Sequence, residues 1–330
     1  MTTTRQKKAT TTGLTLKHPL ATVGLMLSLA GALPAAAVQC GDTIGPNETV
    51  TLSGTLTCDN TTGGLTVVGP AKVDLTDLII DCRDVNNDGY LPAGLHILGH
   101  KALVHGGVVS GCSYGVYVDG QGNHTVEDVE VKRSEIHGFF IPSHKNILRR
   151  NYALLGRASG FVTGDHSNQN TLIENTATSN RVGFTVEGNK HQLRQNSAIS
   201  NDEDGFRLYG EAHRLTENVA TGNIGEGFDV EEGTNNITLY RNRALQSGNG
   251  DGFEISGQRH KLKRNEAYSN WRNGIDVHTA HNIVLKHNEV LNNNGPLSAT
   301  LFDMRDQTPN CDTNIWKKNT FDTASQLCIQ

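Results

Sequence analysis

The chain has 330 residues, of which 36% are hydrophobic and 5% aromatic, and its formal net charge is −5 at pH 7. A negative net charge disfavours nucleic acid or an anionic membrane as the partner. The low apolar and aromatic fractions are typical of a thin core rather than of a bulky globular one.

The first 37 residues have the pattern of a secretory signal peptide. A mostly apolar run over residues 20–33 is followed by Ala35-Ala36-Ala37, the small residues of a cleavage site, so we expect cleavage after Ala37. The basic residues that precede this run are Arg5, Lys7, Lys8 and Lys17. Subtracting these four from 29 leaves 25 Lys and Arg against 34 Asp and Glu, a net charge of −9. No later segment is apolar enough to span a membrane, and we expect a secreted or periplasmic protein without membrane insertion.

All six cysteines follow this segment, and an even number in an exported protein favours disulfides. The pairings that close the shortest loops are Cys40–Cys58, Cys82–Cys112 and Cys311–Cys328, and we predict these three. No C-x-x-C motif is present in the sequence. We therefore expect neither a zinc site nor thiol redox chemistry.

Residues 84–89 match the first half of a Ca²⁺-binding loop. Asp84, Asn86 and Asp88 stand at its first, third and fifth positions, and Gly89 stands at its sixth. Leu95 occupies the twelfth position, where such a loop carries a bidentate glutamate. A structural loop rich in Asx turns explains the same residues. Ca²⁺ is the one cofactor that we predict.

A repeat dominates the middle of the chain. Glycines recur every 22 to 25 residues at Gly115, Gly138, Gly160, Gly183, Gly205, Gly227, Gly252 and Gly274. Most of the later ones precede two apolar residues in alternation, as in Phe184 and Val186, which indicates a short strand with one buried face. A Leu-x-x-Asn motif follows, beginning at Leu172, Leu193, Leu215, Leu239, Leu262 and Leu285. A further asparagine closes many units, at Asn180, Asn201, Asn223 and Asn270.

One such unit cannot bury its own apolar face, but units stacked about 4.8 Å apart can pair every strand with its equivalents. An asparagine at a fixed corner tolerates left-handed backbone, and its amide can bond the same amide one coil away. We therefore predict an all-β fold, a single-stranded right-handed parallel β-helix (solenoid) of about eight readable coils. A leucine-rich repeat has a similar period but needs several leucines per unit.

Four segments follow from this pattern. They are a signal peptide (1–37), an N-terminal cap with the first irregular coils (38–111), the regular coils (112–294) and a C-terminal cap (295–330). Trp316 and Phe321 are expected to seal the last coil, with Cys311–Cys328 holding the cap.

Outward-facing strand positions should stack into columns that cross the coils. The column two residues after each glycine contains Thr185, Arg207, Asp229, Glu254 and Asp276, and the column four residues after contains Glu187, Tyr209, Glu231, Ser256 and His278. Carboxylates on adjacent coils should lie about 5 Å apart, as in a retaining glycosidase pair, and those two coils apart about 10 Å, just beyond the inverting range. Such close like charges need a bound cation or a protonated carboxyl. A solvated polar face without function is the alternative.

The repeats resemble those of the parallel β-helix superfamily of pectate lyases, polysaccharide epimerases and related proteins. The opening Cys40-Gly41-Asp42-Thr43-Ile44 and the closing Trp316…Asn319…Phe321…Cys328-Ile329 are similar to those of a secreted bacterial β-helix group.

Two successive segments, Asn249-Gly250-Asp251-Gly252-Phe253 and Asn270-Trp271-Arg272-Asn273-Gly274-Ile275, resemble active-site coils of alginate C5-epimerases. This resemblance implies catalytic roles for Asp251 and Arg272. Asn273 stands where that pattern has a catalytic histidine, and the Asp-Pro-His-Asp/Glu signature is missing.

The catalytic candidates are therefore Asp251, Arg272, Asp229, Glu254, Asp276 and His278, and the substrate-binding candidates are Arg207, Tyr209 and Glu231. Arg272 would neutralise a uronate carboxylate, while His278 or Tyr209 would replace the missing base. We predict a carbohydrate-active monomer that binds a polysaccharide, as a lyase or C5-epimerase for an acidic polymer or as a glycoside hydrolase. The alternative is a non-catalytic surface or glycan-binding β-helix, which the lack of an aromatic tract in the sequence favours.

Five histidines recur near one corner, at His124, His191, His213, His260 and His281. Pairs such as His191 with His213, and His260 with His281, could hold copper or zinc, as a metal-accessory protein would. Asn235 interrupts the column, and a corner that accepts His or Asn needs only a turn residue. We favour the structural role.

Overall fold

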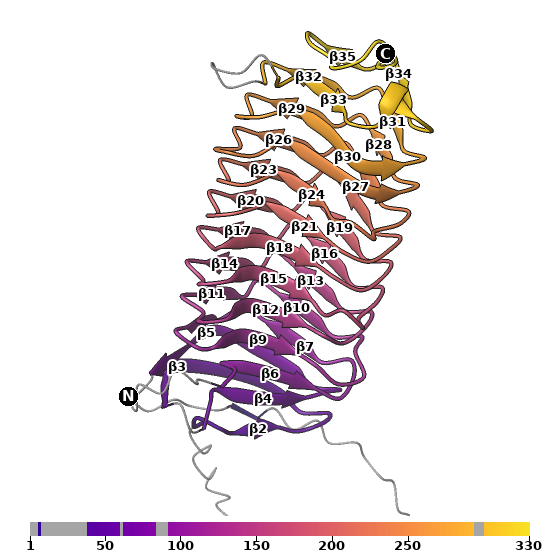
Figure 1. The fold of residues 1–330 in the computed structure, drawn as a ribbon. Helices are drawn as coiled ribbons and strands as arrows, with labels where there is room; N and C mark the ends of the chain where they lie inside the picture. The colour runs from indigo at the N-terminus through magenta and orange to yellow at the C-terminus, as the bar shows by residue number, and fades with distance from the viewer. Residues whose placement is uncertain (1–5, 8–37, 60–61, 84–91, 294–299) are drawn as a thin grey trace, which may run out of the picture.

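The computed structural model describes residues 6–7, 38–59, 62–83, 92–293 and 300–330. The chain winds into one long solenoid whose coils lie one above another along a single axis (Figure 1). Within the described residues all regular structure is β apart from the 3₁₀ turn η1 (Pro309–Cys311). The predicted parallel β-helix is confirmed. The proposed Ca²⁺ ligands Asp84, Asn86 and Asp88 lie outside the described residues.

One face of the solenoid is a twelve-stranded parallel sheet. Its strands are β2 (Thr43–Ile44), β4 (Leu65–Val68), β6 (Leu95–Leu98), β9 (Tyr114–Val118), β12 (His137–Ile141), β15 (Ser159–Thr163), β18 (Val182–Val186), β21 (Phe206–Leu208), β24 (Phe228–Val230), β27 (Phe253–Gln258), β30 (Ile275–His281) and β33 (Met304–Asp306). The predicted glycine-led strands lie in this sheet.

The other faces belong to a 23-stranded sheet with two parallel ladders. The first ladder contains β7 (Leu103–His105), β10 (Thr125–Glu127), β13 (Ile147–Arg149), β16 (Thr171–Ile173), β19 (Gln192–Arg194), β22 (Arg214–Thr216), β25 (Thr238–Tyr240), β28 (Lys261–Lys263), β31 (Val284–Lys286) and β34 (Ile315–Lys317). The second contains β8 (Val108–Ser110), β11 (Glu130–Lys132), β14 (Tyr152–Leu154), β17 (Thr176–Thr178), β20 (Ser197–Ile199), β23 (Val219–Thr221), β26 (Arg243–Leu245), β29 (Glu266–Tyr268), β32 (Glu289–Leu291) and β35 (Thr320–Phe321). The long strands β3 (Thr49–Asp59) and β5 (Lys72–Arg83) pair in parallel, β5 pairs with both β7 and β8, and β1 (Gln6–Lys7) pairs antiparallel with β3.

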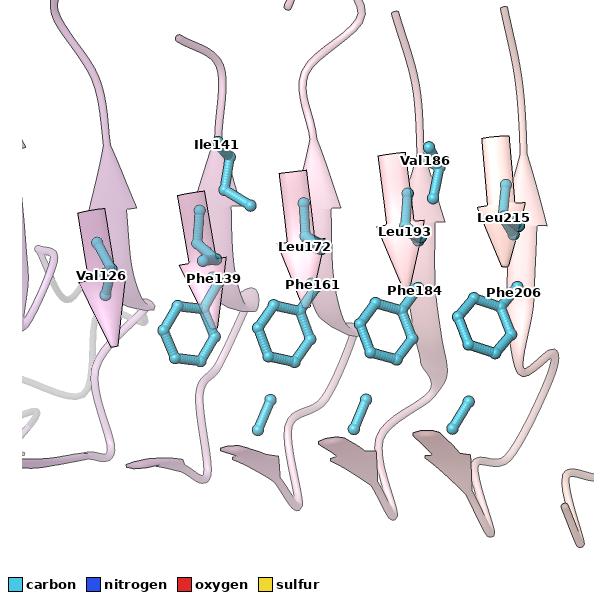
Figure 2. Packing of buried hydrophobic residues seen from close by; sticks show 14 of the residues in the cluster. Val126, Phe139, Ile141, Phe161, Leu172, Phe184, Val186, Leu193, Phe206 and Leu215 are labelled. Atoms are coloured by element: carbon cyan, nitrogen blue, oxygen red, sulfur yellow. The ribbon is translucent and has the colours of Figure 1, made fainter. Parts of the chain in front are cut away.

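The core is a stack of identical side chains from successive coils. The aromatic rings of Phe139, Phe161, Phe184, Phe206, Phe228 and Phe253 are buried, and neighbouring ring centroids lie 4.6 to 4.9 Å apart with nearly parallel planes. Figure 2 shows four of these rings beside the leucines of the first ladder. The stack fixes the register of the coils, because a slip of one residue would turn each ring out of the core.

The second ladder was missed in the sequence, because the inward residue of most of its strands is only an alanine. The close approach of these inward residues explains the recurrent glycines. A Cβ atom added to Gly183 would lie 2.5 Å from the carbonyl oxygen of Gly205 and 2.8 Å from the Cβ of Ala198. The backbone of the twelve-stranded sheet approaches the second ladder too closely at these positions for any side chain.

The asparagine corners form continuous ladders of hydrogen bonds, as predicted. Asn196 donates from its backbone N–H and from Nδ2 to Oδ1 of Asn218, at 2.9 Å in both cases. The left-handed residue, however, is the one before each asparagine, such as Gln195 (φ 56°) and Glu217 (φ 57°). The expected left-handed role of asparagine was therefore wrong, since its contribution is the side-chain amide.

Buried histidines take the place of asparagine at another corner. Nδ1 of His213 accepts the backbone N–H of His191 at 3.1 Å, so the neutral ring carries its proton on Nε2, 2.6 Å from the carbonyl oxygen of Tyr209. Burial lowers the pKa of His213 to about 4. Both ring nitrogens of His213 are thus hydrogen-bonded to backbone groups, which confirms the structural interpretation of this histidine.

Two details of the predicted histidine column were wrong. The residue equivalent to His213 in the next coil is Ile237 rather than Asn235, because each column member stands directly before its first-ladder strand. His281 lies at the end of β30 and is exposed, and its Nδ1 lies 2.9 Å from Oδ2 of Asp312. Ile283, directly before β31, occupies the column position that was expected for His281.

The three predicted disulfides, Cys40–Cys58, Cys82–Cys112 and Cys311–Cys328, are present. At the C-terminal end Trp316 is buried, its Nε1 donates to Oδ2 of Asp306 at 2.9 Å, and Phe321 packs against the core. No helix in the described part of the chain has the length and hydropathy needed to cross a bilayer.

Candidate active site

The acidic column predicted from the sequence exists on the twelve-stranded sheet. Arg207 pairs in register with Asp229, Asp229 with Glu254, and Glu254 with Asp276. The column continues one coil further than predicted, because Asp276 is in register with Arg305 of β33. These strands lie at the C-terminal end of the solenoid, in the orange and yellow part of the ribbon (Figure 1).

A cleft of about 350 Å³ opens at this end of the column. Its lining residues are Asp251, Glu254, Arg272, Asn273, Asp276, His278, Leu301, Arg305 and Gln307. Five of the six predicted catalytic residues are therefore brought together, from segments that lie up to 27 residues apart in the sequence. The sixth, Asp229, does not line the cleft.

Asp251 is the buried carboxyl of the cleft. It stands two residues before β27 and is only 2% exposed. Oδ1 accepts the backbone N–H of Asn273 at 2.6 Å and its Nδ2–H at 2.9 Å. Burial and the nearby charge of Asp276 raise the pKa of Asp251 to about 7. This carboxyl can therefore hold a proton near neutral pH.

Asp276 is the second buried carboxyl, on β30. Its Oδ2 accepts a hydrogen bond from Nε2 of Gln307 at 2.9 Å and lies 3.6 Å from Nη1 of Arg305. Its Oδ1 is buried without a hydrogen-bond partner in the described structure. Burial raises the pKa of Asp276, which Arg305 and Gln307 oppose. An unpaired buried carboxylate oxygen is costly and marks this edge of the cleft as a place for a polar ligand.

His278 lies at an outward-facing position of β30, next to an irregularity in the sheet. Ile255 pairs with Val277, but Gly257 pairs with Ala280, so β30 carries one additional residue at this point. As a result His278 and Thr279 are both exposed, against the usual alternation. Nδ1 of His278 lies 3.8 Å from Oε1 of Glu254, and its side chain is 44% exposed. An accessible imidazole beside a carboxylate is suited to proton transfer.

Two arginines frame the cleft. Arg272 lies in the turn before β30, where its backbone N–H donates to the carbonyl oxygen of Gly250 at 3.2 Å, and it is exposed. Arg305 faces it from the last strand of the sheet. Sequence reasoning missed Arg305 and Gln307 because residues 295–330 were expected to form only a cap. Their signal would have been one further outward-facing strand position after Met304.

The predicted substrate-binding residues lie one to three coils away and are engaged with one another. Arg207 forms ion pairs with Asp204 at 2.6 Å and with Asp229 at 3.7 Å. Burial and the surrounding carboxylates raise the pKa of Asp229 to about 8. The hydroxyl of Tyr209 donates to Oε1 of Glu231 at 3.1 Å. This group continues the acidic face beyond the cleft.

The crowded carboxylates were expected to bind a cation or to take up a proton. The raised pKa values of Asp229 and Asp251 favour the proton. No group of three or more His, Cys, Asp and Glu side chains in the described ranges is arranged to hold a metal ion. The chemistry of the cleft is therefore that of two arginines, an imidazole and carboxyls of different acidity.

Several known structures share this architecture. The periplasmic alginate epimerase AlgG is 14% identical, with 84% of this chain and 85% of that chain covered and a TM-score of 0.54. The A-module of the mannuronan C-5 epimerase AlgE4 from Azotobacter vinelandii is 15% identical, with 87% and 88% covered and a TM-score of 0.62. The AlgE6 A-module from the same organism is 16% identical, with 87% of each chain covered and the same TM-score of 0.62. At these identities the likeness shows a shared fold.

A search of curated protein sequences found no match. The model of the right handed beta helix region matches residues 44–198 and 93–244, which together span more than half of the chain. The repeats, the stacked phenylalanines and this match agree, and the chain belongs to the right-handed β-helix family.

Proposed function

We propose that the protein is a lyase or C5-epimerase that acts on an acidic polysaccharide in the cleft around Asp251, Arg272, Asp276, His278 and Arg305. The observation that carries this proposal is one cleft lined by an accessible imidazole, two arginines and carboxyls of raised pKa. Both reactions need a cation for the uronate carboxylate, a base for the C5 proton and a proton donor.

The first step is common to both reactions. Arg272 and Arg305 bind the uronate carboxylate and reduce the charge that develops on it when C5 is deprotonated. His278 takes the C5 proton, and the electron pair of the C5–H bond moves into the carboxylate to form the enolate. Glu254, 3.8 Å from Nδ1 of His278, stabilises the imidazolium that results.

The second step separates the reactions. In a lyase the electron pair returns to form the C4=C5 double bond, the C4–O4 bond breaks, and the leaving oxygen takes a proton. In an epimerase a proton is delivered to the opposite face of C5. Asp251 is suited to either donation, because its pKa of about 7 lets it carry a proton at neutral pH.

Two further observations support an acidic glycan and an exported protein. The similar solved structures are epimerases of alginate and mannuronan, which favours a uronate polymer over a neutral one. Three disulfides fit an oxidising compartment. We propose that the protein acts as a monomer in the periplasm or outside the cell, after removal of residues 1–37.

The test is incubation of the protein with a panel of uronate polymers and neutral glycans. Unsaturated products are followed by ultraviolet absorbance, and C5 inversion is followed by NMR. We expect activity on at least one uronate polymer, lowered at least about 100-fold by Arg272→Ala and by His278→Ala. Arg194→Ala, which removes an exposed arginine of β19 on another face, serves as the matched control.

Unchanged activity in both cleft variants would remove the site assignment. A wild-type protein that binds a uronate polymer but leaves it unaltered would show that this β-helix is a glycan-binding protein without catalysis, the alternative function. The asparagine at position 273, in place of the histidine of the epimerase pattern, is the observation that favours this second function.

A further inference from the structure

A half-buried aromatic cluster lies on the same twelve-stranded sheet as the cleft, toward its N-terminal end. It contains His96 of β6, Tyr114 and Tyr117 of β9, and His137 and Phe140 of β12, and we call it the aromatic platform. His96 stacks on Tyr117 with ring centroids 4.9 Å apart, and Phe140 lies 5.2 Å from Tyr117 and 5.5 Å from Tyr114. All five side chains are half-buried, and Tyr117 and Phe140 alternate with core residues of their strands, so they face out of the solenoid.

The platform and the acidic face belong to one uninterrupted column. Tyr117 is in register with Phe140, Phe140 with Val162, and Val162 with Thr185. Thr185 is then in register with Arg207, where the charged part begins. The residues between the two regions are small, so no bulky side chain blocks the way. With strands about 4.8 Å apart, the seven steps from β9 to β30 span about 34 Å.

The five rings of the platform carry no carboxylate or basic side chain of Lys or Arg among them, and Asp119 lies at its edge, with Oδ2 3.8 Å from Nε2 of His96. Burial lowers the pKa of His137 to about 4, so its imidazole is neutral at pH 7. The polar atoms are the tyrosine hydroxyls and the imidazole nitrogens, of which Nε2 of His96 and Nδ1 of His137 are buried without a hydrogen-bond partner among the described residues. Flat rings with polar atoms at their edges match a pyranose, which has an apolar C–H face and hydroxyls around it.

A protein partner fits the platform less well. Exposed aliphatic side chains that would extend it into an apolar patch lie elsewhere, since Ile79 and Ile147 belong to the 23-stranded sheet. The sequence shows no aromatic tract, but the structure brings five rings together from three coils. The rings are scattered between residues 96 and 140 in the sequence and meet only when the coils stack.

We propose that the aromatic platform is a second glycan subsite, on which pyranose rings of the same polysaccharide stack while a more distant unit occupies the cleft. This inference rests on the proposed function for the identity of the ligand. It assigns the protein a long binding face, with apolar stacking at one end and charge recognition at the other. Only a chain long enough to span about 34 Å can use both regions.

The test compares polymers with short oligomers. Dissociation constants for polymannuronate and polygalacturonate, and for their trimers, are measured by calorimetry with the wild type and with the double variant Tyr117→Ala/Phe140→Ala. We expect the double variant to bind at least one polymer at least about 10-fold more weakly and to bind the trimers as the wild type does. Tyr240→Ala, on the first ladder of the other sheet, is the control and should change neither value.

A conservative variant keeps the test valid if the double variant does not fold. Phe140→Leu retains an apolar side chain without an aromatic face, and we expect it to weaken polymer binding by about 3-fold or more. Equal polymer affinity in all variants would overturn the proposal. A wild type that binds neither polymer would also overturn it. So would ultracentrifugation that shows a dimeric wild type and a monomeric platform variant, because a second copy of the protein would then cover the rings.

The two proposals fail in different ways. If the wild type is inactive on every polymer, but the double variant loses polymer binding, the platform proposal stands and the catalytic proposal fails. If the wild type is active, but the double variant binds polymer equally well, the catalytic proposal stands and the platform proposal fails.

Discussion

Asn273 donates two hydrogen bonds to the same oxygen of Asp251, one from its backbone N–H at 2.6 Å and one from its side chain at 2.9 Å. Its own Oδ1 accepts the backbone N–H of Phe302 at 2.8 Å. Every strong hydrogen-bonding group of this buried asparagine is thus engaged in holding Asp251 and the last coil. It positions the carboxyl and cannot act as a base.

Asn273→Ala is therefore expected to affect both stability and the pH profile. It removes one of the two hydrogen bonds to the buried Oδ1 of Asp251 and leaves the backbone N–H of Phe302 without its partner, which should lower the free energy of unfolding by about 2–4 kcal/mol. Loss of the side-chain hydrogen bond to Asp251 should also raise the pKa of that carboxyl further. Denaturant unfolding measures the first effect, and the pH profile of turnover measures the second. Asn249→Ala, at an exposed turn nearby, is the control, and equal effects in the two variants would contradict this role.

The stability of the protein should pass through a maximum near neutral pH. The buried histidines, with pKa values lowered to about 3 or 4 (His191, His213 and His260), cannot take up the protons that the unfolded chain binds below pH of about 6.5, so stability falls as the pH drops through that range. Asp229 and Asp251 have raised pKa values, so the native state binds more protons than the unfolded chain. Their contribution is full below the unfolded value of about 4 and is lost as the pH rises toward about 8.

The carboxyl effect can be isolated by mutation, because the histidines contribute equally to the wild type and to a carboxyl variant. We expect the free energy of unfolding to fall by roughly 2 kcal/mol between about pH 6.5 and pH 8.5 in the wild type, and by less in Asp229→Asn. Urea unfolding at several pH values gives both curves. Identical slopes for the two proteins in this window would refute the protonation of Asp229 in the native state.

Arg305 should contribute to polymer recognition although it lies in the last strand of the sheet. Removing it takes one of two cations from the cleft and leaves Asp276 with a hydrogen bond from Gln307 alone. For Arg305→Ala we expect KM for a uronate polymer to rise by about 10-fold, while Arg305→Lys retains part of the affinity. The effect should shrink as salt is added. A KM that stays at the wild-type value would mean that Arg305 only compensates the charge of Asp276.

Much of the fold could be predicted because the repeated positions tolerate few other residue types. At most of the recurrent glycines an added Cβ would lie within 3.0 Å of an alanine Cβ of the second ladder, and each Leu-x-x-Asn motif supplies one buried leucine and one ladder amide. The second ladder was not predictable from hydrophobic alternation, because a single alanine per strand gives no apolar signal. Likewise the left-handed residues before the asparagines are chemically varied, since only their backbone matters.

The candidate site was predicted in part. Register alone places Glu254 beside Asp276 and both near Asp251, so the acidic cluster follows from counting residues. His278 likewise follows from the outward-facing column, whereas the exposure of Thr279 beside it depends on an additional residue in β30, which no count of repeats reveals. To predict Arg305 at the cleft, one must know that the chain makes one more coil after the regular repeat. To predict the aromatic platform, one must know how three less regularly spaced coils stack.

The most direct test of the proposed chemistry is the fate of the C5 hydrogen. A uronate polymer labelled with deuterium at C5 is incubated with the protein, and the label released to water is measured together with product formation. We predict release of the label by the wild type, a loss of at least about 100-fold in His278→Ala, and wild-type release in Arg194→Ala. Retention of the label in a polymer that the protein cleaves would show hydrolysis instead, and would contradict abstraction of the C5 proton in this cleft.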